Sequence, residues 1–311
     1  MSNTKQSAID LKQLLSNAQL PALPQSAISL LELSQNPRNG PAEFAEPIET
    51  DPGLTGQVLR FVNSSYFGFS REISSVKLAI TLVGTRTIKN FSLWSAVFSL
   101  MPNPKCGMLD LKSLWQDSLR RALFARIMAK HIGFKATEEV FAAALLQDMA
   151  VPLLAKEASD RYSKLFDERA KSERRLSDIE QDTFGWTHAE AAGMMARQWN
   201  LPEDFAVMIE SHTEIDCCLD EMSKSNDKSE ELGKIIVALS ALLPSAADSQ
   251  WNEFEEFESA YNNIVLKGVP KLAAVLAQTD EEFTEFSPVL KITSPKMSLI
   301  DYHDQLTSVA N

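Results

Sequence analysis

The strongest constraint on the fold of this chain is an uninterrupted apolar run at residues 140–146, Val-Phe-Ala-Ala-Ala-Leu-Leu. A helix over this run has no polar face to present to water, so we expect it to lie at the centre of a domain. Gln147 and Asp148 follow immediately. A carboxylate at the end of a central helix is costly to bury unless it is paired or bound. Asp148 is therefore predicted to cap a helix, to pair with an arginine, or to belong to a metal or phosphate site.

The charge and composition limit the classes of partner. A net charge of −12 disfavours duplex nucleic acid, because a basic patch would be needed to offset it. No apolar run approaches the roughly 18 residues of a membrane helix. The polar residues 1–6 lack the apolar core of a secretory signal. Three cysteines, two of them adjacent, predict reduced thiols in a cytoplasmic protein. The basic residues are predicted to lie on solvated helix faces: Arg120, Arg121, Arg126, Lys130 and the segment 169–175.

Helical spacing of apolar residues recurs along the chain, and no alternating pattern is long enough for a strand, so the sequence predicts an all-α protein. Asp51 before Pro52, and Ser75, are expected to cap helices. Two capping boxes are predicted, Ser177 with Glu180 and Thr187 with Glu190. Residues 102–107 form the clearest linker, and the acidic, aromatic segment 246–311 is expected to form peripheral helices.

Few residues offer chemistry. The sequence has no glycine-rich phosphate loop, no nucleophile elbow and no closely spaced Cys/His cluster. The remaining candidates lie near predicted helix ends or on inward faces: Asp117, Asp148, His188 and His212. His188 falls in the first turn of a helix, where a histidine is often a surface residue. His212 shares an apolar face with Phe205, Met208 and Ile209, as an ordinary core histidine would.

Several separated motifs, in order, resemble the HDOD family, the HD-related output domains of bacterial signalling. They are Asp51-Pro-Gly-Leu, Leu59-Arg-Phe-Val-Asn-Ser-Ser-Tyr-Phe-Gly, Ile73-Ser-Ser-Val-Lys-Leu-Ala-Ile, Gly185-Trp-Thr-His-Ala-Glu and Ile209-Glu-Ser-His. The resemblance covers roughly residues 18–245. It implies a multi-helix HD-like bundle with an N-terminal helical subdomain packed on it. We therefore expect three parts: residues 1–104, residues 105–245, and a C-terminal segment, residues 246–311.

The resemblance also implies where a metal site would lie. In active HD phosphohydrolases, histidines and aspartates hold one or two divalent metals that activate water. Here the first histidine position is Asp117, and the His-Asp pair is Gln147-Asp148. Ala150 and Val151 stand where active relatives carry glycine and lysine. His188 matches, the later His-His pair is Ser211-His212, and the final aspartate position falls on Ser240.

These exchanges predict a vestigial site. Glutamine and serine are weak neutral ligands, so only Asp148, His188 and His212 keep their donors, with Asp117 as a conceivable substitute. Such a set can hold at most one weakly bound divalent metal and not the pair that cyclic-dinucleotide hydrolysis requires. Asp148 is then expected to bond to helix amides or to His188.

We therefore expect a non-catalytic bacterial signalling protein that binds a protein partner, without a cofactor. The preferred contact is the loop at residues 63–70, in which Tyr66 and Phe67 follow Asn63 and are expected to be exposed; the alternative is that both rings belong to the core. One alternative is a divergent phosphohydrolase that acts on a nucleotide or cyclic dinucleotide with one metal. Another is a nucleotide sensor without turnover.

Overall fold

The computed structural model describes residues 10–18, 20–34, 36–225, 228–246, 248–264, 270–288 and 292–309. Residues 1–6, on which the prediction of no secretory signal rests, lie outside these ranges. Within them every regular element is a helix, which confirms the all-α prediction. The N-terminal helices are α1 (Leu11–Asn17), α2 (Gln25–Ser34), α3 (Pro41–Glu49), α4 (Pro52–Val62), the 3₁₀ turn η1 (Ser65–Phe67), α5 (Val76–Val83) and α6 (Thr85–Leu100).

The helices of the middle part of the chain follow. They are α7 (Leu111–Ile132), α8 (Thr137–Leu146), α9 (Ala150–Glu157), α10 (Ser159–Arg169), α11 (Leu176–Phe184), α12 (His188–Gln198), α13 (Glu203–Glu210), α14 (Ile215–Lys224) and α15 (Lys228–Ala241). The C-terminal helices are α16 (Phe254–Ile264), α17 (Leu272–Phe286) and α18 (Leu299–Val309).

Helix α8 is the buried centre that its apolar run predicts. Every residue from Val140 to Leu146 is buried, and α8 packs against α6, α7, α13 and α15. The helix ends at Leu146, and α9 begins at Ala150. Gln147 and Asp148 therefore lie in a turn between two buried helices, which places a carboxylate deep inside the protein.

Local capping chemistry sets the predicted helix ends. The Asp51 and Ser75 side chains accept hydrogen bonds from the amides of Leu54 and Leu78, as expected for N-caps. Gly84 follows α5 with a φ of 99°, a conformation that glycine adopts without strain. These short caps fix the directions in which α4, α5 and α6 leave their turns.

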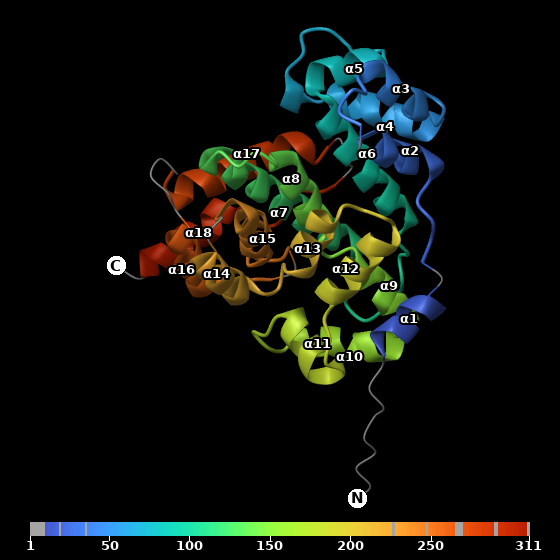
Figure 1. The fold of residues 1–311 in the computed structure, drawn as a ribbon. Coiled ribbons are helices and arrows are strands. Elements are labelled where there is room, and N and C mark those ends of the chain that lie inside the picture. The colour runs from blue at the N-terminus through green and yellow to red at the C-terminus, as the bar shows by residue number, and fades with distance from the viewer. Residues whose placement is uncertain are drawn as a thin grey trace, which may run out of the picture.

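The N-terminal helices α2 to α6 form a lobe at one end of the molecule (Figure 1). Helix α1 lies toward the opposite end, so residues 20–24, which lead to α2, run along the bundle before the chain enters the lobe (Figure 1). The indole Nε1 of Trp199, which follows α12, donates a hydrogen bond to the Pro21 carbonyl at 2.9 Å and so fastens this connection to the end of α12.

The C-terminal segment is not peripheral, contrary to the expectation from its acidic sequence. Helix α17 packs along α7, and Phe283 and Phe286 are buried. The aromatic residues of the segment outweigh its charges, because each large ring removed from water stabilises the fold by about 2–3 kcal/mol. The boundaries at residues 104 and 245 stay predictions.

The prediction of a solvated basic face on α7 is wrong for three of its four residues. Arg120 and Arg126 are buried, and Arg121 is largely buried, while Lys130 is exposed. Arg126 lies 4.8 Å from the centres of the Tyr66 and Phe141 rings and donates to Glu282 at 2.7 Å. These arginines hold α7 to its neighbours.

Within the described residues, no helix has the length and apolar character to cross a bilayer.

Candidate functional site

The first site residue, Asp148, is positioned by the end of the apolar run. The turn between α8 and α9 carries it, and its side chain is buried. One carboxylate oxygen, Oδ2, forms an ion pair with Arg121 of α7. The other oxygen, Oδ1, faces two imidazoles. Asp148 thus pairs with an arginine, one of the outcomes predicted for it.

The second residue, His188, is placed by a capping box. Thr187 caps α12 and Glu190 bonds back to the Thr187 amide at 3.1 Å, as the sequence predicts. This geometry makes His188 the first residue of α12 and directs it inward. Its Nε2 lies 3.3 Å from Asp148 Oδ1, so His188 is a buried site residue and not a surface one.

The third residue, His212, follows α13 on the apolar face that its spacing predicts. Its Nδ1 donates to the Ile209 carbonyl at 2.6 Å. Its Nε2 lies 3.6 Å from Asp148 Oδ1 and 3.2 Å from His188 Nε2. Asp148, His188 and His212 thus place one donor atom each within 4.8 Å of one another.

Glu180 of α11 is a site residue that the sequence analysis missed. The capping box predicted for it with Ser177 is wrong, because Arg175 precedes α11 and both residues lie inside the helix. Glu180 is fully buried; its Oε2 accepts from the His188 backbone amide at 2.8 Å and from His188 Nδ1 at 2.6 Å. Its Oε1 accepts from the Tyr162 hydroxyl at 2.8 Å. Glu180 lies four residues from both Leu176 and Phe184, which marks its place on the apolar face.

The electrostatics of the cluster fix the protonation of each group. Burial opposes ionisation of Asp148, but the Arg121 guanidinium and the two imidazoles hold its pKa well below its usual range. Burial also opposes a charge on His188, yet the carboxylates of Glu180 and Asp148 raise its pKa to about 9. Burial lowers the pKa of His212, which stays neutral. The cluster therefore contains an anionic Asp148, a cationic His188 and a neutral His212 at neutral pH.

His188 makes stability depend on pH. Its pKa is about 9 in the folded protein, against 6.5 for an ordinary histidine. The stabilising contribution is complete below pH 6.5 and is lost as the pH rises through 9, which costs about 3 kcal/mol in total. Urea unfolding at pH 6.5 and pH 9 should show this loss. His188→Gln should abolish it, and His131→Gln, at an exposed site, should retain it. An unchanged loss in His188→Gln would contradict the assignment.

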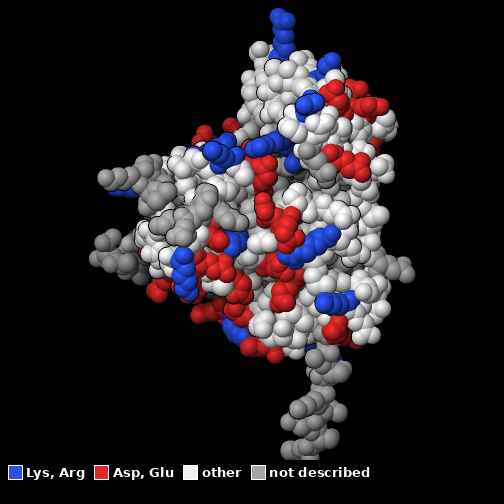
Figure 2. Space-filling model, in the orientation of Figure 1, with Lys and Arg blue, Asp and Glu red and all other residues white. Residues whose placement is uncertain are grey.

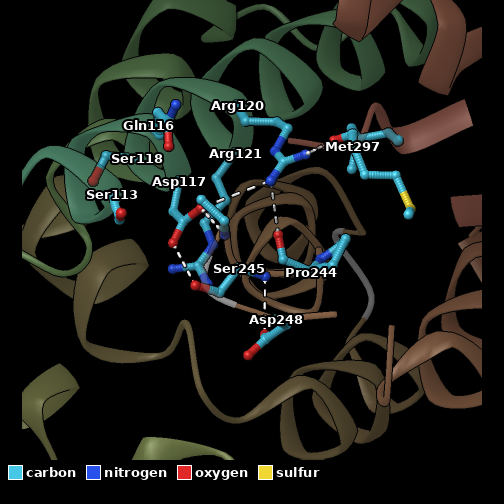
Figure 3. A network of polar contacts seen from close by, with 12 residues as sticks. Ser113, Gln116, Asp117, Ser118, Arg120, Arg121, Pro244, Ser245, Asp248 and Met297 are labelled. Atoms are coloured by element: carbon cyan, nitrogen blue, oxygen red, sulfur yellow. Dashed lines mark hydrogen bonds and ion pairs between the residues drawn. The ribbon is translucent and has the colours of Figure 1, made fainter. Parts of the chain in front are cut away.

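Asp117, the residue expected at the first histidine position, is bound by the protein itself. Its Oδ2 accepts from the Ser245 hydroxyl and its Oδ1 from the Ala246 amide, both at 2.7 Å. Arg120 of the same helix donates to the carbonyls of Pro244 and Met297 (Figure 3). Burial raises the pKa of Asp117 against the opposing effect of Arg121 and Arg120. Asp117 thus fastens the chain after α15 to α7.

Two other expected positions take no part in the cluster. Gln147 is fully buried, and its side-chain oxygen and nitrogen have no hydrogen-bond partner within the described part of the chain. Ser240 is also fully buried and donates to the Val237 carbonyl at 2.7 Å. Neither residue lines the cavity described below.

The cluster forms one wall of a cavity of about 600 Å³, within the range that holds a small molecule. Asp117, Asp148, His188 and His212 all line it, together with Arg121. The remaining wall mixes apolar residues with charged groups. These include Met108, Leu109, Phe166, Arg169, Lys171, Leu176, Asp248 and Glu253. The cavity is therefore polar around the cluster and amphipathic elsewhere.

The donor set fits one divalent metal and not two. Asp148 Oδ1 and the two Nε2 atoms would be the ligands, and each Nδ1 is held by an acceptor, Glu180 or the Ile209 carbonyl. Metal-binding histidines are oriented in this way. A second ion does not fit, since Arg121 already pairs with Asp148 Oδ2 and Asp117 is engaged by the chain at residues 245–246.

In the loop at residues 63–70, which the sequence predicts as an interaction site, the two aromatic rings are partly covered. Tyr66 and Phe67 are half-buried and not exposed, with Tyr66 packed edge-on against Phe286 at 4.2 Å between ring centres. Asn63 makes paired hydrogen bonds to the Ile73 backbone at 2.7 and 2.8 Å, which closes the loop. The alternative, that both rings belong to the core, describes them better.

Comparison with known proteins gives a family match. The family model of the HDOD domain matches residues 20–215. An uncharacterized protein of Treponema pallidum is 26% identical over 198 residues, which cover 62% of this chain and 37% of the relative. The uncharacterized protein YuxH of Bacillus subtilis is 33% identical over 85 residues, 27% of this chain and 20% of the relative. The chain thus spans well under half the length of these curated relatives.

Solved structures share the fold. An HDOD domain protein of unknown function from Geobacter sulfurreducens has a TM-score of 0.63 at 19% identity, and the match covers 96% of this chain and 93% of that one. A candidate metal-dependent phosphohydrolase from Shewanella amazonensis has a TM-score of 0.62 at 14% identity, over 90% and 97% of the two chains. A candidate signal transduction protein from Marinobacter aquaeolei has a TM-score of 0.66 at 19% identity, over 89% and 60%.

Proposed function

The chain belongs to the HDOD family, and we propose that it is a non-catalytic regulatory protein of bacterial signal transduction that acts by binding a protein partner. The family match and the names of the structural relatives support a signalling role. Free thiols at Cys106, Cys217 and Cys218 agree with a cytoplasmic location. The proposal includes no cofactor.

The observation that carries the proposal is the buried ion pair between Arg121 and Asp148. Two-metal hydrolysis needs a carboxylate with both oxygens available to the ions. Here the guanidinium supplies a fixed positive charge on the side where a second ion would sit. His188, whose pKa is raised to about 9, supplies a second positive charge on the side of Oδ1. The protein's own cations therefore neutralise the carboxylate that would otherwise attract metal.

A single-metal phosphohydrolase is the second candidate, favoured by the three donors within 4.8 Å of one another. Asp148, His188 and His212 would hold the ion, which would supply an activated water when bound. Glu180 would keep His188 oriented through its Nδ1. For this function His188 must first lose its proton, because a protonated imidazole cannot bind a metal.

We expect the purified protein to hydrolyse neither bis(p-nitrophenyl) phosphate nor a cyclic dinucleotide above the rate of His188→Ala, with Mg²⁺, Mn²⁺ or Zn²⁺ added. Metal analysis after purification without chelator should give well under one ion per chain. Turnover that disappears in both Asp148→Ala and His188→Ala, with one metal lost, would replace our proposal by the second candidate. A nucleotide that raises the melting temperature without product would instead indicate a sensor.

A further inference from the structure

The hairpin of α10 and α11 forms one side of the cavity. Residues from the end of α10 to the start of α11 line this side. The other sides include the cluster of Asp148, His188 and His212, and Asp248, which follows α15. The hairpin lies at the edge of the bundle (Figure 1), where its main neighbours are α9 and α12. A peripheral element therefore forms part of the wall around the buried cluster.

No buried side chain holds the tip of this hairpin, which we define as residues 167–175. Its sequence is Asp-Glu-Arg-Ala-Lys-Ser-Glu-Arg-Arg, and the structure, which describes all nine residues, leaves none of them buried. Figure 2 shows charged side chains of both signs along the lower edge of the molecule, where the hairpin lies. A segment without buried apolar contacts separates from its neighbours at much lower cost than the core does.

The base of the hairpin, by contrast, is anchored. Tyr162 and Leu165 of α10 and Ile179 and Glu180 of α11 are buried. The Tyr162 hydroxyl donates to Glu180 Oε1 at 2.8 Å, and Glu180 also binds His188. The hairpin is thus fixed where it joins the bundle and weakly held at its tip.

One bidentate ion pair joins the tip to the opposite side of the cavity. The Nη1 and Nη2 atoms of Arg169 donate to Oδ1 and Oδ2 of Asp248 at 2.7 and 2.9 Å. Two parallel bonds of this kind fix the geometry of both side chains. The pair is partly exposed, with 26% of the Arg169 side chain and 14% of the Asp248 side chain accessible, so water can replace the contact. The other ion pairs of the tip, from Arg174 to Glu168 and Asp182, stay within the hairpin.

Asp248 is held in place by its own surroundings. Its Oδ2 accepts from the Ser245 amide at 3.1 Å (Figure 3), and its carbonyl accepts from the Tyr302 hydroxyl at 2.8 Å. Ser245 in turn donates to Asp117 of α7. The carboxylate is therefore the fixed half of the pair, and Arg169, on the tip, is the half that can leave.

We propose that the hairpin tip is a flap at the cavity and that the ion pair between Arg169 and Asp248 is the latch that closes it. With the latch formed, the tip completes the wall around the cluster. When the pair breaks, the tip moves outward on its anchored base, and the cluster becomes accessible from this side. The inference goes beyond the proposed function, because it concerns access to the cavity and holds for a binding protein and a hydrolase alike.

The first test measures how fast a thiol in the cavity reacts. Ala241, the last residue of α15, is buried and lines the cavity, so Ala241→Cys in the full chain places a thiol there. N-ethylmaleimide should label this thiol about tenfold faster when Arg169→Gln is added, because the tip then spends more time open. Peptide mass spectrometry gives the rate, with the exposed Cys217 as internal reference. Arg174→Gln removes a tip guanidinium whose partners lie in the hairpin and should leave the rate unchanged.

The second test measures the movement itself. Spin labels are attached at Lys171→Cys on the tip and Gln250→Cys after α15, two exposed positions, in a chain that carries Cys217→Ser. Pulsed electron spin resonance should show one main distance, and a second, longer distance should appear with Arg169→Gln. With the tip label moved to the exposed base position, at Asp160→Cys, the distance to position 250 should not change. Melting temperatures should also stay unchanged, because the base and the core remain packed.

Three results would overturn the inference. Equal labelling rates with and without Arg169→Gln would show that the ion pair does not control access. An unchanged distance between the tip and position 250 would show that the tip does not move. A lower melting temperature with a longer distance from the base would make the pair a support for the whole hairpin and not a latch. Turnover in the hydrolysis assay would refute the proposed function and leave the flap standing.

Discussion

Asp148→Asn is expected to lower the free energy of unfolding by about 3–5 kcal/mol, because it leaves the buried Arg121 without its anion and removes one of the two carboxylates that face protonated His188. Arg121 pairs with Oδ2 of Asp148, and protonated His188 contacts Oδ1. Asparagine keeps the shape of the side chain, so the loss measures charge and not packing. Urea unfolding at pH 7 would record it. Asp204→Asn, at an exposed carboxylate, should change the free energy by less than about 0.5 kcal/mol.

A double-mutant cycle separates the ion pair from its surroundings. Arg121→Met alone removes the partner of Asp148 and should destabilise by a similar amount. The double variant, Arg121→Met with Asp148→Asn, should be more stable than the sum of the two losses predicts, with a coupling of about 1–3 kcal/mol. A loss below about 1 kcal/mol in Asp148→Asn would show that the pair does not hold the site together. The proposed exclusion of a second metal would then lose its physical basis.

The sequence predicted those parts of the site that depend on local pattern. The apolar run at residues 140–146 located the central helix and the buried position of Asp148, and both were found. The Thr187 and Glu190 capping box placed His188 at the start of α12, and the spacing of Phe205 and Ile209 directed His212 inward. Each of these features depends on residues within about one or two turns of the same helix, so the pattern that predicts it can be seen directly in the sequence.

The predictions that were wrong concern charged side chains that are buried because they pair with a residue far away in the sequence. Arg121 is separated from Asp148 by 27 residues, and Arg126 from Glu282 by 156 residues. An isolated arginine on a helix is best predicted as solvated, because burial without a partner is costly. The prediction that α17 lies at the periphery was wrong for a related reason. Its carboxylates suggested a surface helix, but the side of α17 that carries Phe283 and Phe286 packs into the core.

The buried role of Glu180 was also not predicted from the sequence, and its loss gives the second large expected change in stability. Its place in a plausible capping box concealed its role as a buried acceptor of three hydrogen bonds, from the His188 amide, His188 Nδ1 and the Tyr162 hydroxyl. Glu180→Ala should lower the free energy of unfolding by about 3–5 kcal/mol, because it opens a cavity and removes one of the two carboxylates that face His188. Chemical denaturation at pH 6.5, where His188 is protonated, would show the full effect.

The neighbouring variants identify which property of Glu180 matters. Tyr162→Phe removes one of the three donors and should cost only about 1 kcal/mol. Asp178→Ala, at an exposed carboxylate of the same helix, should stay within about 0.5 kcal/mol. Glu180→Gln keeps the volume but loses the charge, so it should lower the pKa of His188 and shrink the loss of stability between pH 6.5 and pH 9. If Glu180→Gln kept that alkaline loss in full, Asp148 alone would hold the proton on His188. Glu180 would then act only through packing. The proton that prevents His188 from binding a metal would be held by Asp148 alone, whose charge Arg121 already neutralises.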